Sequence, residues 1–438
     1  MKLYSHVEKE GLLDPRQHGF RKNRSCATAL SLFTHDLTSH LDEPNMLAGI
    51  VFVDLKKAFD SIRPLRLLLL LFDIDIPPII LLYLCMYFTN RTFKIKLNDF
   101  LSKLFELFRG VPQGSILAPL LFSLFYNGVG SSLLTAFYGL FADDLSFYLF
   151  NSNLEDLVLS LSKVLESLHK WCEDKDLVIN FSKTKFMVIS KKSLNTEIPQ
   201  LECNGNVIEY VTEFKYLGVI FDNTLTFDSH FHHVCKRVSA AVGCLMFIKR
   251  FLNLRVFKVL LNSFILSIID YGLPVWGQLS KSQLNVLQSK VNSILGAYFY
   301  PQICNKFERV NKIAHNCEKR KYKSVNLDFS ELYEKCNILT VSERLQYFYA
   351  IFAFQSIRFN FLPEISQNFI FGKSSRHQNL IVPTHKTSFF QKSVIYKSIL
   401  VWNSLDTEVK QPNISLNKFK SFINQALLRQ RADEFVSV

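Results

Sequence analysis

The stretch Leu140–Tyr148 has the sequence LFADDLSFY, in which two adjacent carboxylates, Asp143 and Asp144, lie between two short apolar runs. Phe, Leu and Tyr in runs of this length are typical of paired strands. Asp is also a common turn residue. Taken alone, the stretch therefore predicts an ordinary β-hairpin with an acidic turn.

A second stretch changes this interpretation. Residues 48–53, AGIVFV, form a continuous apolar run that ends at Asp54, as expected of a strand buried on both faces. Three carboxylates at the ends of core strands are costly to bring together unless cations neutralise them. Mg2+ is held by one or two carboxylates plus substrate phosphates. The pattern indicates two-metal phosphoryl transfer, with the metals about 3.5–4 Å apart.

Three segments carry a family resemblance: VFVDLKKAFD at 51–60, GVPQGS at 110–115 and FADD at 141–144. In this order and at these spacings they closely resemble the palm motifs of reverse transcriptases, in particular those of non-LTR (LINE-type) retrotransposons. The resemblance implies an α+β fold. It consists of a right-hand polymerase palm with an antiparallel sheet and helices, partial fingers, a helical thumb and a helical C-terminal extension.

The resemblance also implies domain boundaries, and it is strongest from Asp14 to Trp276. We expect partial fingers at 1–47, the palm at 48–228, the helical thumb at 229–300 and the helical extension at 301–438. The family carries earlier fingers strands, and many such elements carry an upstream endonuclease domain. Neither is found in this sequence, so the chain is expected to be N-terminally truncated.

The implied activity is RNA-directed DNA synthesis, in which a primer 3′-hydroxyl attacks the α-phosphate of a dNTP. By resemblance, Asp54 and Asp143 bridge two Mg2+ ions and Asp144 assists, with Mn2+ as the alternative metal. The expected partners are an RNA template, a DNA primer, a dNTP and other proteins encoded by the same element.

The resemblance implies that four further residues contact the incoming nucleotide or its pyrophosphate. Phe59 would pack under the deoxyribose, although a core Phe after the strand is the plain alternative. Gln113 and Gly114 would lie around the nucleotide, on a loop that opens a helix. Lys183, in the pattern Asn-x-x-Lys-Thr-Lys that resembles the fourth palm motif, would protonate the pyrophosphate. A surface lysine on a turn is its alternative.

Template and primer contacts are implied at two places. Arg21 and Arg24, on a loop that contains Gly and Asn, would hold template phosphates, and a solvated basic turn is the alternative. Tyr216, Leu217 and Gly218 resemble the hairpin that grips the primer end.

The charge balance agrees with a polyanionic partner. The 438 residues carry 51 Lys and Arg against 38 Asp and Glu, a net charge of +13. Part of the excess is local, because residues 231–300 hold eight basic residues and one acidic residue, a net +7. Such a patch suits salt-sensitive binding to phosphates. A solvated basic face would look the same.

The cysteine content and the hydropathy of the sequence indicate the cellular compartment that the protein is expected to occupy. The nine cysteines are odd in number and include no Cys-x-x-Cys, which argues against a disulfide framework and suits a reducing compartment. The first residues lack the apolar core of a signal peptide, so we expect an intracellular protein, nuclear or cytoplasmic. Residues 116–141 carry no charge and are long enough to span a bilayer, but Pro and Gly interrupt them. Buried palm elements are favoured, and no membrane association is expected.

Two rival functions remain open. One is a catalytically inactive, nucleic-acid-binding remnant of a retroelement, which the missing fingers favour and the three carboxylates disfavour. The other is a membrane protein, favoured only by hydropathy.

Local patterns predict the remaining elements. Apolar periodicity and capping residues predict helices over 25–37, 64–71, 78–88, 116–126 and 154–171, and the family resemblance implies the start of the helical thumb over 228–251. Alternation predicts a half-exposed strand over 90–98, a strand-turn-strand unit over 177–189 and a hairpin around 214–219.

Overall fold

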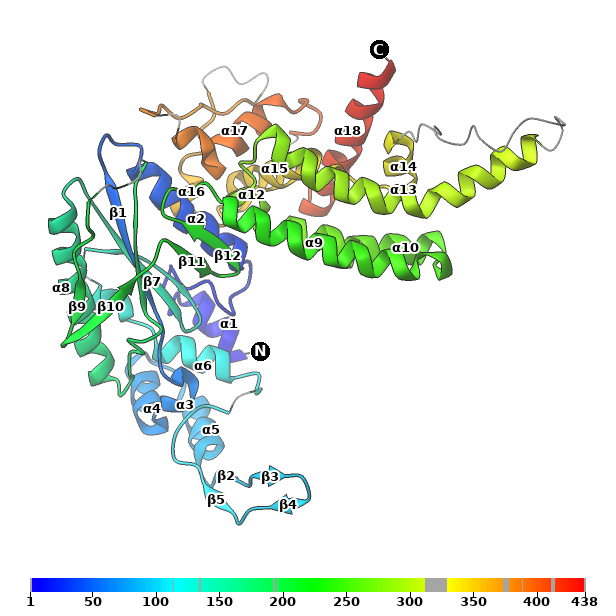
Figure 1. Cartoon of the computed structure of the whole chain (residues 1–438). Coiled ribbons are helices and arrows are strands. Elements are labelled where there is room, and N and C mark those ends of the chain that lie inside the picture. The colour runs from blue at the N-terminus through cyan, green and yellow to red at the C-terminus, as the bar shows by residue number, and fades with distance from the viewer. Residues whose placement is uncertain are drawn as a thin grey trace. The chain divides into compact units, whose positions relative to one another are not determined.

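The computed structural model describes residues 2–112, 114–133, 135–191, 194, 196–311, 329–372, 378–387, 389–410 and 414–436. Two compact units make up the chain, Met1–Leu225 and Thr226–Val438 (Figure 1). The first combines a sheet with helices, and the second is built of helices. The α+β class predicted from the sequence is confirmed.

The first unit is organised around a six-stranded sheet with the order β6-β7-β1-β8-β10-β9. Its strands are β1 (Leu47–Val53), β6 (Phe137–Phe141), β7 (Asp144–Asn151), β8 (Lys185–Ile189), β9 (Leu201–Cys203) and β10 (Asn206–Tyr210). Strand β1 lies between β7 and β8 and pairs antiparallel with both, whereas β8 and β10 pair in parallel. The first strand of the chain is therefore interior to the sheet.

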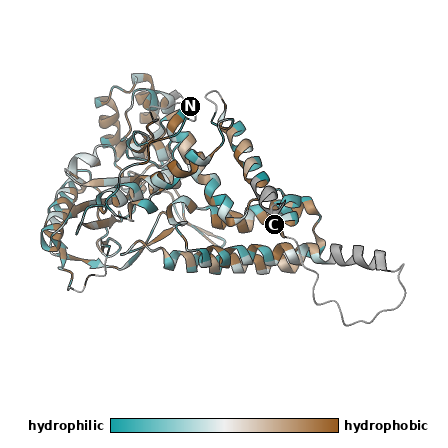
Figure 2. Ribbon diagram, turned by 90° about the horizontal axis from the view of Figure 1, so that it is seen from above, coloured by the Kyte–Doolittle hydropathy of each residue, from teal (hydrophilic) through white to brown (hydrophobic). Residues whose placement is uncertain are grey.

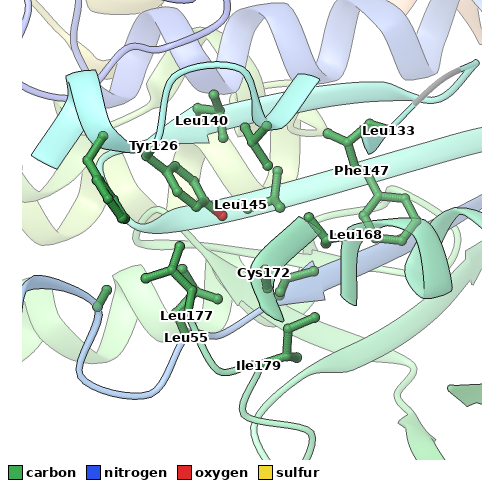
Figure 3. Close-up of a cluster of buried hydrophobic side chains, with 14 of the residues drawn as sticks. Leu55, Tyr126, Leu133, Leu140, Leu145, Phe147, Leu168, Cys172, Leu177 and Ile179 are labelled. Carbon is green, nitrogen blue, oxygen red and sulfur yellow. The ribbon is translucent and has the colours of Figure 1, made fainter. Parts of the chain in front are cut away.

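Strand β1 is buried along its whole length, as its continuous apolar run predicted. Helix α8 (Leu154–Asp174) covers one face so closely that a Cβ on Gly49 would lie 2.5 Å from Leu161 Cδ1. Leu145 and Phe147 of β7 pack with Leu168 and Cys172 of α8 in the main hydrophobic core, and Figure 3 shows these side chains gathered together. Glycine leaves room at position 49 for the Leu161 and Leu157 side chains of the helix.

Helix α2 (Cys26–His40) contributes to an aromatic cluster with residues of the sheet's opposite face. Ser25 caps its N-terminus and forms a capping box with Thr28. The Phe33 ring lies 5.2 Å from that of Tyr148 and 5.1 Å from that of Tyr216. Tyr216 belongs to a separate hairpin, β11 (Glu213–Tyr216) and β12 (Val219–Asp222), which confirms the hairpin predicted around 214–219.

The described residues of the first unit form six other helices. They are α1 (Lys2–Lys9), α3 (Ala58–Ser61), α4 (Pro64–Asp73), α5 (Pro78–Phe88), α6 (Ala118–Phe125) and α7 (Val129–Ser132). The predicted helix over 78–88 is confirmed at both ends, and those over 64–71 and 154–171 each extend further. Proline in the first turn explains why two of these starts were readable from the sequence.

Two strand predictions need correction. Residues 90–98 do not form one half-exposed strand but two exposed two-residue strands, β2 (Thr92–Phe93) and β3 (Lys96–Leu97). These pair with β5 (Phe105–Glu106) and β4 (Phe100–Leu101) in an arm that extends beyond α5 (Figure 1). The alternation has no core to face there. In 177–189 only the second strand forms, and the first is reduced to a bridge between Ile179 and Leu55.

The second unit contains ten α-helices among its described residues. They are α9 (Asp228–Ile248), α10 (Leu254–Leu260), α11 (Ser267–Asp270), α12 (Leu273–Trp276), α13 (Lys281–Asn311), α14 (Phe329–Cys336), α15 (Val341–Phe359), α16 (Pro363–Ser366), α17 (Val394–Ser404) and α18 (Leu416–Val436). Hydrophilic and hydrophobic residues alternate along the long helices (Figure 2). Arg344 of α15 donates to Asp270 of α11, and a π-helix at Leu261–Leu266 separates α10 from α11.

Cysteines and hydropathy can be checked against the described residues. All seven cysteines that the structure describes with their side chains are free thiols. None of the described helices combines the length and the apolarity needed to cross a bilayer.

Candidate functional site

The register of β1 and β7 brings two of the predicted catalytic carboxylates opposite each other. Phe52 pairs with Ser146 and Val53 with Leu145, so the next step of the same register sets Asp54 against Asp144. Because side chains alternate along a strand, both carboxylates belong to the face that carries Phe52 and Ser146. Like charges directly opposite each other repel across a strand pair. The sheet thus concentrates negative charge at one end of its central strands.

The third carboxylate lies in the turn between β6 and β7. Phe141 pairs with Asp144, which leaves Ala142 and Asp143 as a two-residue loop. Ala142 has a φ of +58°, a left-handed value that residues other than Gly, Asn and Asp rarely adopt. A positive φ at the first position of a two-residue loop is usually supplied by glycine. This turn is therefore strained by its own sequence.

Burial and mutual repulsion make the acidic pair less acidic than ordinary aspartates. The pKa of Asp144 is raised first by burial and then by the charges of Asp143 and Asp54. The pKa of Asp143 is raised by burial and by Asp54, against a lowering by a hydrogen bond from its own backbone. The three side chains are close enough to feel one another's charge, which is the environment that a bound cation relieves.

The donor set fits a hard divalent cation in its chemistry. Within the described part of the chain, no three His, Cys, Asp or Glu side chains lie close enough together to hold a metal ion by themselves. Two facing carboxylates, Asp54 and Asp144, match the usual protein share of a Mg2+ site, in which substrate phosphates supply further oxygens. The fit is thus to a cation bound jointly with a phosphorylated substrate.

A pocket of about 480 Å3 opens beside these carboxylates. Its lining unites strand ends, the turn before β8 and the β11–β12 hairpin, and it includes the predicted residues Asp54, Asp144, Lys183, Tyr216 and Leu217. Lys183 is exposed, and Lys185 also lines the pocket. Acidic, basic and aromatic side chains from stretches far apart in sequence therefore meet at one place.

The β11–β12 hairpin is fixed beside the carboxylates by aromatic packing and one hydrogen bond. Phe214 stacks on Phe52 with ring centroids 4.1 Å apart, and Ser146 Oγ donates to Tyr216 Oη over 3.1 Å. The turn consists of Leu217 (φ +44°) and Gly218 (φ +83°). A backbone with two positive φ values matches the right-handed twist of a hairpin. Gly218 shapes the turn but does not line the pocket.

The predicted nucleotide-side residues are only partly placed at this pocket. Phe59 is half-buried and stacks on Phe122 at 4.3 Å, and it does not line the pocket. Gly114 is exposed with a φ of +84°, and a Cβ there would meet no atom within 4 Å. Gln113 lies outside the described residues. Their proposed nucleotide contacts stay predictions.

The two predicted template arginines are away from the pocket lining. Arg21 donates to both carboxylate oxygens of Glu8, over 3.0 and 2.8 Å, and to the Asp14 carbonyl over 2.9 Å. A template phosphate would have to compete with this ion pair. Arg24 is half-buried, and its charge helps to lower the pKa of Glu8. Their template contacts also stay predictions.

The structure adds two residues that the sequence interpretation did not single out. Asn180 Nδ2 donates to Asp54 Oδ2 over 2.8 Å, and the Asp54 N–H donates to Thr184 Oγ1 over 3.3 Å. The Asn180 N–H also donates to the Asp54 carbonyl over 2.8 Å. Both residues lie in the Asn-x-x-Lys-Thr-Lys pattern, where only Lys183 had been given a role. They hold Asp54 by its side chain and its backbone.

Comparison with known proteins gives a consistent set of similarities. Residues 2–221 match the family model described as "Reverse transcriptase (RNA-dependent DNA polymerase)". The chain is 25% identical over 306 residues to "Probable RNA-directed DNA polymerase from transposon BS" of Drosophila melanogaster, covering 68% of this chain and 34% of that protein. It is 26% identical over 301 residues to "RNA-directed DNA polymerase from mobile element jockey" of the same species, covering 65% and 32%.

The matches cover only part of each relative, and solved structures give a more distant likeness. The chain spans about a third of the length of these curated relatives. Among solved structures, a telomerase of Candida tropicalis, in a structure titled as a complex with a fragment of telomeric RNA, covers 78% of this chain and 49% of its own at 15% identity. Its TM-score of 0.38 is too low to carry an argument.

Proposed function

Because the chain belongs to the reverse transcriptase family, with relatives among non-LTR retrotransposon polymerases, we propose that it synthesises DNA on an RNA template at the pocket beside Asp54 and Asp144. The observation that carries the proposal is the β1–β7 register, which sets these two carboxylates opposite each other with Asp143 in the adjoining turn. The reaction class is transfer of a nucleotidyl group from a dNTP to a primer 3′-hydroxyl.

Reverse transcriptases generally use divalent metal ions, and we propose two Mg2+ ions, with Mn2+ as a substitute, held by Asp54, Asp143 and Asp144. When bound, such ions would neutralise the carboxylates, lower the pKa of the attacking hydroxyl and steady the leaving phosphates. The chain itself contributes the orientation of Asp54, because Asn180 and Thr184 fix both its side chain and its backbone.

The remaining pocket residues divide between the leaving group and the primer. Lys183 is exposed on the pocket wall and is suited to donate a proton to pyrophosphate. Tyr216 and Leu217 present the hairpin turn to the same space, where a primer end would lie against them. Phe59, Gln113 and Gly114 are proposed for the nucleotide and Arg21 and Arg24 for the template, on the family resemblance.

Incorporation of dNTP on a primed RNA template with Mg2+ tests the proposal. The native chain is compared with Asp143→Ala, and Asp73→Ala serves as the control because Asp73 is exposed at the end of α4. We expect Asp143→Ala to lower incorporation by at least about 100-fold, as expected when electrostatic stabilisation of the reacting phosphate is lost. Asp73→Ala should match the native chain.

Chelation supplies the second half of the test. EDTA should abolish incorporation, and Mg2+ or Mn2+ added back should restore it. Salt-sensitive RNA binding without any incorporation by the native chain would contradict the proposal and identify a non-catalytic nucleic-acid-binding protein. Equal activity of the native chain and Asp143→Ala would refute the assigned site.

A further inference from the structure

The most distinctive feature outside the pocket is a segment from the start of the chain that lies along the outer edge of the sheet. Gln17 forms a parallel bridge with Leu140 of the edge strand β6. The His18 N–H donates to the Leu140 carbonyl over 2.8 Å, and the Leu140 N–H donates to the Arg16 carbonyl over 3.2 Å. This pairing brings Gln17 level with the end of β6, next to the turn that holds Asp143.

The Gln17 side chain then reaches the turn itself. Its Oε1 accepts from the Ala142 N–H over 2.9 Å, and its Nε2 donates to the Ala142 carbonyl over 3.3 Å. The same Oε1 accepts from the Gly19 N–H over 2.7 Å. With only 2% of its surface exposed, Gln17 is sealed from water. One amide side chain therefore binds both polar groups of the residue that precedes Asp143.

The contact is also tight in shape. A Cβ on Gly19 would lie 2.3 Å from the Ala142 nitrogen, so only glycine lets the segment come this close to the turn. Ala142 holds the φ of +58° that its own side chain disfavours. Strained backbone persists only where the surroundings over-determine it. The contacts of Gln17 and Gly19, which lie outside the hairpin, hold Ala142 in this strained conformation.

We infer that Gln17 is a positioning residue for the acidic turn: by binding the Ala142 N–H and carbonyl it fixes the direction in which the Asp143 carboxylate is presented. The inference rests on the proposed polymerase function. Misplacing a reacting group by about 1 Å costs roughly 100-fold in rate. Substrate affinity changes little, because Gln17 is buried and does not line the pocket.

The first test is the kinetics of Gln17→Leu, which keeps the size of the side chain and removes its three hydrogen bonds. We expect kcat for dNTP incorporation to fall by about 100-fold while KM for dNTP stays within about 3-fold of the native value. Gln200→Leu is the matched control, because Gln200 is exposed in the same unit. An unchanged kcat in Gln17→Leu would overturn the inference.

A second variant covers the case in which Gln17→Leu fails to fold. Gln17→Glu keeps an oxygen that can accept from Ala142 and Gly19 but sets a second oxygen against the Ala142 carbonyl, so the introduced carboxyl can donate only when protonated. We expect its kcat, relative to the native chain, to rise as the pH falls from about 8 to about 6, because burial raises a carboxyl pKa. A ratio that does not change with pH would count against the positioning role.

A third measurement separates this inference from the proposed function. Amide hydrogen exchange at Ala142 should be at least about 10-fold faster in Gln17→Leu than in the native chain, because the buried hydrogen bond that protects the N–H is removed. If the native chain incorporates no dNTP, the proposed function fails, and exchange alone decides whether Gln17 holds the turn. Identical exchange in both proteins would overturn the inference whatever the activity.

Discussion

Two hairpins of the same sheet use two-residue loops with opposite relations to their own sequence. The loop between β9 and β10 consists of Asn204 (φ +47°) and Gly205 (φ +71°), the pair that most readily adopts two positive φ values. The loop between β6 and β7 consists of Ala142 and Asp143, and its φ of +58° falls on an alanine. The first turn is encoded locally, and the second is held by contacts from elsewhere in the chain.

The two turns differ because one only connects strands and the other also carries a carboxylate of the candidate site. Residues at a turn that only connects strands can be chosen for the turn, whereas the acidic turn must present a carboxylate. Its stability is then supplied from outside, by Gln17 at the Ala142 backbone and by the buried residues of β7. The following four predictions test this contrast, from the largest expected effect to the smallest.

The largest effect is expected from the packing that supports the acidic hairpin. Phe147→Ala removes a fully buried ring from β7 and should lower the free energy of unfolding by about 3–5 kcal/mol. Val207→Ala on β10, where the side chain is 55% exposed, should change it by less than about 0.5 kcal/mol. Denaturant titration of both variants measures this. Equal losses would mean that the two hairpins depend equally on the core.

The second prediction concerns Asp54, which is held by a hydrogen bond from Asn180, a residue distant in sequence. Asn180→Ala removes the 2.8 Å hydrogen bond to Asp54 Oδ2 and should lower dNTP incorporation by about 10- to 100-fold, as is usual for groups that orient metal ligands. Asn206→Ala, in the locally encoded hairpin, should leave incorporation unchanged. Steady-state rates at saturating Mg2+ and dNTP make the comparison, and full activity in Asn180→Ala would limit external support to the acidic turn.

The third prediction is that opposite substitutions in the two turns change stability in opposite directions. Gly205→Ala places a Cβ where φ is +71° and should destabilise the chain by about 1–2 kcal/mol, although no atom lies within 4 Å. Ala142→Gly relieves the same kind of strain and should stabilise it by up to about 1 kcal/mol, after the entropy of the unfolded glycine is subtracted. Thermal unfolding measures both. Destabilisation by Ala142→Gly would show that the alanine methyl, rather than Gln17, secures the turn.

The smallest effect concerns pH in the presence of a chelator. The Asp144 pKa is raised above its ordinary value of 3.8, so the folded chain binds this proton more tightly than the unfolded chain. The contribution to stability is present below that value and is lost as the pH rises through the raised pKa. Asp144→Asn should therefore flatten the fall in stability from pH 4 upwards and raise Tm at neutral pH by about 1–2 °C. The effect is small because solvent screens the charge of a carboxyl that is only partly buried.

The control for this last prediction is Glu202→Gln on β9, an exposed carboxylate whose removal should leave the pH dependence as it is. With saturating Mg2+ the order should change. The native chain should then gain more stability than Asp144→Asn, because cations bind the folded carboxylates. A Tm of Asp144→Asn that equals the native value in EDTA at every pH would contradict the proposed repulsion.

Much of the fold was readable from patterns that act over a few residues. The apolar run before Asp54 predicted a fully buried strand, and proline in the first turn predicted the starts of α4 and α5. The strand expected over 90–98 was wrong, because alternation implies a buried face only where other elements supply a core. No pattern in the sequence indicated that the arm formed by β2–β5 projects away from the hydrophobic core.

The candidate site was predictable in its residues but less so in its supports. Asp54 and Asp144 could be named from their strand ends, and both lie next to the last pair of the β1–β7 register, Val53 with Leu145. The support of Asp54 by Asn180 was present in a quoted motif but not recognised. Gln17 was out of reach, because its hydrogen bonds to Ala142 cross 125 residues of sequence and no local spacing records them.

The position of β1 in the sheet has a consequence for synthesis on the ribosome. Both strands that flank it, β7 and β8, lie far downstream, and Val53 pairs with Leu145. At about 5–20 residues per second, roughly 90 residues of translation separate the two, which is about 5–20 s. For that time an entirely apolar strand with two unpaired edges is outside the exit tunnel. The nascent chain should therefore depend on chaperones that bind apolar segments, and slowing translation before residue 145 should increase aggregation.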